Sequence, residues 1–203
     1  MLKSLILAAA MFLVAVPATE TLTQAERDKA IAELEGSKKA FLDATKGLSE
    51  AQWKFKAAPE RWSIEQCAEH IALAEGFIFG NITNGVMKAP LTPEKRSATA
   101  GKDEKIVAML QDRSFKATAP EPIDPAKKPM THDDSMKLFL ESRGKSEDFI
   151  KTTQEDLRDR MYDGPGPIGP LDAYQWVLFM SGHTRRHTLQ ILEVKADANF
   201  PKM

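Results

Sequence analysis

Two histidines four residues apart are the clearest chemical signal in the sequence. If residues 172–196 form a helix, the imidazoles of His183 and His187 lie about 40° apart on one of its faces. At this spacing two imidazoles can bind a single metal ion. Taken alone, the pair is weak evidence, because two helical histidines four residues apart are usually ordinary surface or core residues. The surrounding residues therefore decide how it is interpreted.

The face that carries the two histidines is predominantly apolar. Its other members are Trp176, Phe179, Met180, Gln190 and Val194. Such a face is expected to point into the protein. Burying two imidazoles there without partners would cost about 1–3 kcal/mol each. We therefore expect something to bind their ring nitrogens.

His70 is the third candidate ligand. It shares one face of a second predicted helix with Gln66, Cys67, Ala74 and Phe77. Three neutral imidazoles leave one open position on a tetrahedral ion, which is the pattern of a catalytic site rather than a structural one. A structural metal would need a fourth protein ligand, and the sequence offers no obvious candidate. His132 is expected to be exposed near a helix start, so we leave it out of the site.

Four predicted helices would position these side chains. Helix signals cover residues 23–46, 63–86, 131–157 and 172–196. The capping-box pattern, a Ser, Thr or Asp followed three residues later by Glu or Gln, marks three of the four starts. Strand signals are almost absent, and residues 163–170 (DGPGPIGP) are expected to form neither helix nor strand. The sequence therefore predicts an all-α four-helix bundle.

The connection between the second and third helices is unusually long. Residues 88–128 are rich in Pro, Lys, Ala and Thr, and only residues 104–113 read as a short helix. A connection of this length in a compact domain usually covers a site or stays mobile.

The first residues of the chain predict export. A short positive region, Met1–Lys3, precedes the apolar run Leu5–Val16, and Val16-Pro-Ala18 places small residues at a signal-peptidase site. We predict a signal peptide, residues 1–18, and a mature domain, residues 19–203, that is periplasmic or secreted. An uncleaved anchor is the alternative, but the run is shorter than the about 20 residues that span a bilayer. No stable membrane insertion is expected after cleavage.

Composition argues against a nucleic-acid-binding protein and against a fold stabilised by disulfide bonds. The formal net charge is −1 at pH 7, without the basic excess expected of a nucleic-acid-binding protein. Cys67 is the only cysteine, so no intramolecular disulfide can form. With 42% hydrophobic residues, the domain is expected to be globular and stabilised by packing.

Two stretches resemble a known family. ERWSIEQCAEHIALAE (residues 60–75) has a Trp-Ser helix start followed by His70, and LDAYQWVLFMSGHTRRHTLQILEVKA (residues 171–196) has His, three residues, His and then Gln. Both are similar to motifs of the DinB-like superfamily of bacterial metal-binding four-helix bundles, and the helix pattern matches over nearly the whole chain. The resemblance implies that His70, His183 and His187 are ligands of Zn²⁺, Ni²⁺ or Fe²⁺.

The resemblance implies less about a reaction. Some members transfer low-molecular-weight thiols such as bacillithiol or mycothiol, whereas this chain differs from them in its export signal and its long connection. Two functions stay open. One is a metal-dependent enzyme, thiol transferase-like or a hydrolase, with an unknown small-molecule substrate. The other is a non-catalytic periplasmic module that binds a metal or a small ligand.

Residues near the three histidines have competing interpretations. Cys67 and Trp62 occupy hydrophobic-staple positions, so Cys67 is expected to pack rather than to bind metal. Gln190 is expected to hold a histidine N–H or a metal-bound water, or to make an uncommitted contact. Arg186 would either bind an anion at the pocket rim or be solvated. Glu69 and Glu75 flank the site in sequence, but helical rotation places Glu69 off the face of His70.

The last predicted helix has a second apolar strip. Leu178, Leu189 and Leu192 lie nearly opposite the histidines. Either the long connection or a second copy of the chain must cover them, and we favour a homodimer.

Overall fold

The computed structural model describes residues 21–116, 118–127, 129–165 and 168–202. The predicted signal peptide, residues 1–18, lies outside the described residues. Within them, no helix is both long enough and apolar enough to cross a membrane.

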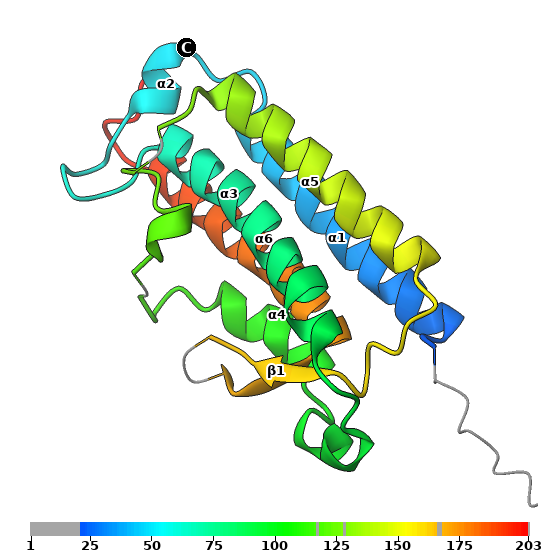
Figure 1. Ribbon diagram of the computed structural model, residues 1–203. Coiled ribbons are helices and arrows are strands. Elements are labelled where there is room, and N and C mark those ends of the chain that lie inside the picture. Colours follow the sequence, from blue (N-terminus) through cyan, green and yellow to red (C-terminus); the bar gives the residue numbers. More distant parts are fainter. Residues whose placement is uncertain (1–20, 117, 128, 166–167, 203) are drawn as a thin grey trace, which may run out of the picture.

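Four long helices form the bundle, which confirms the predicted fold class. They are α1 (Gln24–Thr45), α3 (Ile64–Asn84), α5 (His132–Thr152) and α6 (Ala173–Lys195). Each packs against two others, in the cyclic order α1, α5, α3, α6. Figure 1 shows α1 lying beside α5 and α3 lying in front of α6.

Local side-chain chemistry starts the helices where the sequence predicts. Thr23, Ser63 and Asp172 each accept a hydrogen bond from the backbone three residues on, and the Glu or Gln there bonds back. The short helix α2 (Glu50–Lys54) has the same capping box, formed by Ser49 and Gln52. Helix α2 was not predicted, although its capping-box signal is present in the sequence.

The directions of the helices explain the long connection. Lys195 at the end of α6 bonds to the Ala44 carbonyl at the end of α1, so these two helices are parallel. Arg27 at the start of α1 bonds to the carbonyls of Ile150 and Thr153 at the end of α5, so α5 runs the opposite way. Since α3 is also antiparallel to α1, α3 and α5 are parallel (Figure 1). The chain between them must return along the bundle, about 30 Å for a helix of this length.

The connection contains its own helical turns. They are η1 (Val86–Lys88), η2 (Pro93–Ala98), α4 (Asp103–Gln111) and η3 (Glu121–Ile123). The predicted short helix at residues 104–113 corresponds to α4, which packs against α6. The contact is close, because a Cβ atom built on Gly182 would lie 2.8 Å from the side chain of Leu110.

The third long helix ends earlier than predicted. It stops at Thr152 rather than near Leu157. Arg27 satisfies its last carbonyl groups, and the Asp156 side chain accepts the next free backbone N–H groups at Arg158 and Asp159. Leu157 is fully buried, so it continued the apolar periodicity without being helical.

The prediction that residues 163–170 contain no strand is wrong at both ends. The strands β1 (Met161–Asp163) and β2 (Pro170–Asp172) pair antiparallel, with Tyr162 opposite Leu171. Gly169 has φ 70, which suits glycine in the tight connection. Both strands of a two-stranded sheet are edge strands. Pro170 can therefore lie in β2 although it has no backbone N–H to donate.

Much of the predicted second apolar strip of α6 is covered within the chain. Leu178 is fully buried and Leu189 is half-buried, while Leu192 is 46% exposed. Helices α1 and α4 both pack against α6. The strip therefore does not by itself require a second copy, and the homodimer stays a prediction.

Candidate metal centre

The structure brings the three predicted histidines together. His70 lies in the second turn of α3, and His183 and His187 lie on successive turns of α6. One ring nitrogen from each lies within 4.8 Å of the other two. The Nε2 atoms of His70 and His183 are 3.3 Å apart.

This spacing fits a tetrahedral metal ion. Zinc–imidazole bonds of about 2.0–2.1 Å place two nitrogen ligands about 3.3–3.4 Å apart in a tetrahedron. Among the described residues, the three histidines form the only group of three or more His, Cys, Asp or Glu side chains that could hold an ion. The donor set is therefore three imidazoles with no protein carboxylate.

The outward-facing nitrogens of two ligands are already fixed. The Nδ1 atom of His70 lies 2.8 Å from the Ile123 carbonyl oxygen, and Nδ1 of His187 lies 3.0 Å from Oε1 of Gln190. Because these oxygens only accept, both Nδ1 atoms donate. The lone pairs of the neutral rings then lie on Nε2, as metal binding requires. Gln190 thus has one of its predicted roles, holding a histidine N–H.

Burial keeps the ligands neutral. His70 is 3% exposed and His187 is 9% exposed. Burial lowers the pKa of His70 to about 4, against an upward effect of the Ile123 hydrogen bond. Burial lowers the pKa values of His183 and His187 well below the ordinary 6.5, and the neighbouring histidines add to the effect. Neutral imidazole is the form that binds metal.

Two segments outside the long helices cover the centre. The ring of Trp62, just before α3, lies 4.8 Å from that of His70 and 5.9 Å from that of His187, centroid to centroid. Ile123 is 5% exposed and belongs to the long connection, so part of this connection lies over the histidines, which is one of the two expectations for it. Trp62 was predicted only to pack in a hydrophobic staple, and a backbone carbonyl such as that of Ile123 carries no sequence signal.

Cys67 and Arg186 do not act at the centre. Cys67 is fully buried, and burial raises the pKa of its thiol to about 12, so it is a protonated packing residue as predicted. Neither interpretation of Arg186 included the partners that it has in the structure. Its guanidinium donates to the carbonyls of Leu110, Asp112 and Phe115, because the connection folds over it.

The two glutamates flanking the site in sequence have other partners. Glu75 forms a bidentate ion pair with Arg143 of α5, and both side chains are fully buried. Glu69 is 2% exposed, and burial raises its pKa to about 7 although the Met130 backbone N–H bonds to it. Neither carboxylate belongs to the metal-ligand group.

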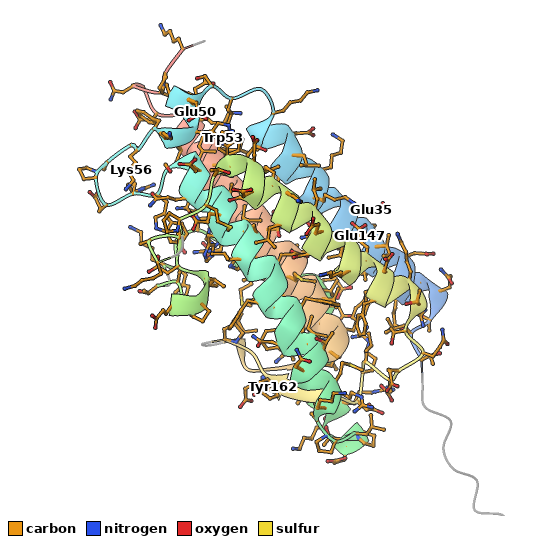
Figure 2. The ribbon with its side chains drawn as sticks, turned by 45° about the horizontal axis from the view of Figure 1, so that its top comes forward. Glu35, Glu50, Trp53, Lys56, Glu147 and Tyr162 are labelled. Atoms are coloured by element: carbon orange, nitrogen blue, oxygen red, sulfur yellow. The ribbon has the colours of Figure 1, made fainter. Side chains whose placement is uncertain are left out.

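His132 is outside the centre, as predicted, but it is not fully exposed. Its side chain is 22% exposed and its ring stacks on Trp53, with centroids 4.7 Å apart and planes at 10°. Figure 2 shows Trp53 and Glu50 on α2 at one end of the bundle and Tyr162 of β1 at the other. The stacked Trp53 ring therefore covers part of the His132 ring, which was expected from the sequence to be exposed.

The family is decided by comparison of the whole chain. The sequence profile of the DinB superfamily matches residues 33–191, which include all three histidines. The chain belongs to the DinB superfamily. The resemblance predicted from the two motifs is therefore confirmed.

Two proteins from Bacillus subtilis are similar to this chain. YuaE of strain 168, described as an uncharacterized protein, is 28% identical over 156 residues, covering 74% of this chain and 87% of YuaE. The solved structure of YfiT matches with a TM-score of 0.52 at 13% identity, over 90% of this chain and 93% of YfiT. YfiT is described as a probable metal-dependent hydrolase with an unusual four-helix bundle topology. This likeness shows the shared fold.

Proposed function

We propose that the protein is a metal-dependent hydrolase that holds one divalent ion, Zn²⁺, Ni²⁺ or Fe²⁺, through His70, His183 and His187. The observation that carries the proposal is the convergence of the three ring nitrogens within 4.8 Å, with no fourth protein ligand among the described residues. The description of YfiT, a DinB-like structural relative, supports hydrolysis as the type of reaction.

The chain's own residues prepare the site. His70, His183 and His187 would hold the ion, and an ion bound by three imidazoles would supply Lewis acidity for a substrate. Ile123 and Gln190 hold the His70 and His187 rings so that Nε2 faces the centre. Trp62 shields the same two rings from water, which strengthens electrostatic interactions there.

A non-catalytic role in binding a metal or a small ligand is the second candidate. The observation in its favour is that no Asp or Glu joins the histidine group among the described residues. Hydrolases usually position an acid or base beside the reacting atoms. Binding without turnover would favour this second role.

One experiment separates the two candidates. Protein purified without chelators and without nickel resin is analysed for metal, stripped, reloaded with Zn²⁺, Ni²⁺ or Fe²⁺, and tested on chromogenic esters and amides. Hydrolysis that requires the ion and is lost in His183→Ala supports the hydrolase. Stoichiometric metal without turnover supports the binding module, and absence of metal binding refutes both the hydrolase and a metal-binding role.

We also propose that the protein is exported and starts at Thr19 after cleavage. The motif Val16-Pro-Ala18 supports this site. Intact-mass measurement of protein from the cell envelope should give the mass of residues 19–203. Full-length chain in the cytosolic fraction would contradict it.

A further inference from the structure

The side-chain oxygen of Gln190 has two neighbours. It accepts a hydrogen bond from Nδ1 of His187 at 3.0 Å, and Nη1 of Arg113 lies 3.5 Å from it. Arg113 belongs to the long connection, two residues after α4. The guanidinium of Arg113 is therefore linked to His187, a proposed metal ligand, through a single side chain, that of Gln190.

The guanidinium of Arg113 is itself held in place. Its Nε and Nη2 atoms bond to the two carboxylate oxygens of Glu193, at 2.6 and 3.0 Å. This bidentate pairing fixes the plane of the guanidinium and aims Nη1 at Gln190. Arg61 also approaches Glu193, at 3.6 Å.

A side chain of α6 holds the backbone around Arg113 in place. Arg186, next to His187 in sequence, donates to the carbonyls of Asp112 and Phe115, on either side of Arg113. The connection thus adopts a set position relative to the helix that carries the ligands.

The positive charge of Arg113 determines whether the oxygen or the NH₂ group of the Gln190 amide faces His187. An amide presents either an oxygen acceptor or an NH₂ donor. Flipping the amide would turn its NH₂ group toward both the guanidinium and the imidazole N–H. Arg113 disfavours that flip, so Gln190 offers oxygen and His187 carries its proton on Nδ1.

We propose that Arg113 is a positioning residue of the metal centre, acting through Gln190 to hold His187 with its Nε2 lone pair toward the ion. Together with the Ile123 carbonyl at His70, it makes the long connection a part of the centre. This inference rests on the proposed metal site at the three histidines.

A double-mutant cycle tests the coupling. Zn²⁺ affinity is measured by competition with a chromophoric chelator for the wild type, Arg113→Met, Gln190→Ala and the double variant. Each single change should weaken Zn²⁺ binding about tenfold or more, as loss of such outer contacts does. The double variant should bind no more weakly than Gln190→Ala alone, because Arg113 acts through Gln190.

Arg61→Met is the matched control. It removes a cation from the same Glu193 without touching Gln190, and should change Zn²⁺ affinity less than about twofold. Thermal melts of the metal-free variants show whether any affinity loss merely follows loss of stability. Additive losses in the cycle, or equal effects of Arg113→Met and Arg61→Met, would overturn the proposal.

A second readout is independent of metal. Nitrogen NMR of the metal-free protein reports the His187 tautomer, which should be Nδ1–H in the wild type and mixed in Arg113→Met. An unchanged tautomer in that variant would refute the role of Arg113. Wild-type protein that binds none of Zn²⁺, Ni²⁺ and Fe²⁺ would instead refute the proposed function, and the tautomer measurement would still stand.

Discussion

The Nε2 atoms of His70 and His183 lie 3.3 Å apart, on helices that run in opposite directions. Since Nδ1 of His70 donates to Ile123, its Nε2 presents a lone pair toward His183. Without an ion, the Nε2 proton of His183 must fill this contact. A bound cation would replace that proton and satisfy His187 as well, so the arrangement is one that a metal stabilises.

The three histidines should behave as one site. Replacing His70, His183 or His187 by Ala should each strip the ion or weaken its binding by orders of magnitude, because two imidazoles remain. The metal-bound wild type should also melt higher than these variants, since an ion bound only by the folded state stabilises it. Elemental analysis and thermal melts with added Zn²⁺ or Ni²⁺ measure both effects.

His132→Ala is the control for that series. His132 stacks on Trp53 away from the centre, so its loss should leave the ion bound. If no first-row divalent ion shifts the melting temperature of the wild type, the metal site is wrong.

The buried ion pair of Arg143 and Glu75 should be a stability determinant. Arg143 also bonds to Ser37 of α1 and Thr184 of α6, so its guanidinium links α5 to the other three long helices. Arg143→Met leaves the Glu75 carboxylate buried without its cation, which should cost about 3–5 kcal/mol of unfolding free energy. Urea unfolding measures the loss.

Two further variants check the cause. Adding Glu75→Gln to Arg143→Met should restore part of the stability, since the unpaired charge is removed. Lys39→Ala breaks the exposed pair with Asp43 and should change stability little. A small effect of Arg143→Met would show that the core tolerates the lone carboxylate.

Cys67 should be dispensable for metal binding. Its thiol is fully buried with a pKa of about 12, so it is neither ionised nor accessible at neutral pH. Cys67→Ala should keep the ion and lose about 1 kcal/mol of stability. Folded wild type should resist iodoacetamide. Loss of the ion in Cys67→Ala, or rapid labelling of the folded protein, would mean that Cys67 acts at the site.

The sequence predicted the features that depend on local chemistry. Capping boxes such as Thr23–Glu26 and Ser63–Gln66 bond within one turn, so the helix starts could be read directly. The helical spacing of His183 and His187 indicated their common face. The mostly apolar helix face of His70 suggested it as the third ligand, and the motif resemblance supported that choice.

Features that depend on distant partners could not be predicted in this way. The end of α5 depends on Arg27, more than a hundred residues away. The role of Arg186 depends on carbonyls of the connection, and Ile123 reaches His70 through its backbone, so its side chain gave no indication. The sequence thus indicated that the long connection could cover a site, but it did not indicate which residues of the connection would do so.

The pH dependence of the centre follows from the buried imidazoles. With the ordinary pKa of free histidine, about 6.5, the ion would be lost as the pH falls below neutrality. Because burial lowers the pKa of His70 to about 4, the folded protein keeps that ligand neutral well below pH 6.5. We therefore expect Zn²⁺ to stay bound through pH 6 and to be released as the pH approaches 4. Elemental analysis after dialysis across this range measures the release.

The stability of the metal-free protein should show the same lowered pKa. Between pH 6.5 and about 4 the unfolded chain binds a proton at His70 that the folded protein does not, so stability falls as the pH falls. Glu69 acts in the opposite sense. Its pKa is raised from 4.5 to about 7, so the folded protein gains stability as the pH falls through that window.

Variants separate the two contributions to the stability of the metal-free protein. Glu69→Gln removes the opposing effect, so stability should fall more steeply between pH 7 and 4.5 than in the wild type. His70→Ala should make the fall shallower, by an amount approaching roughly 3 kcal/mol at pH 4. Urea unfolding at pH 7, 6, 5 and 4 gives the slopes. Identical slopes in wild type and His70→Ala would mean that His70 titrates normally in the folded protein and that its burial does not control the site.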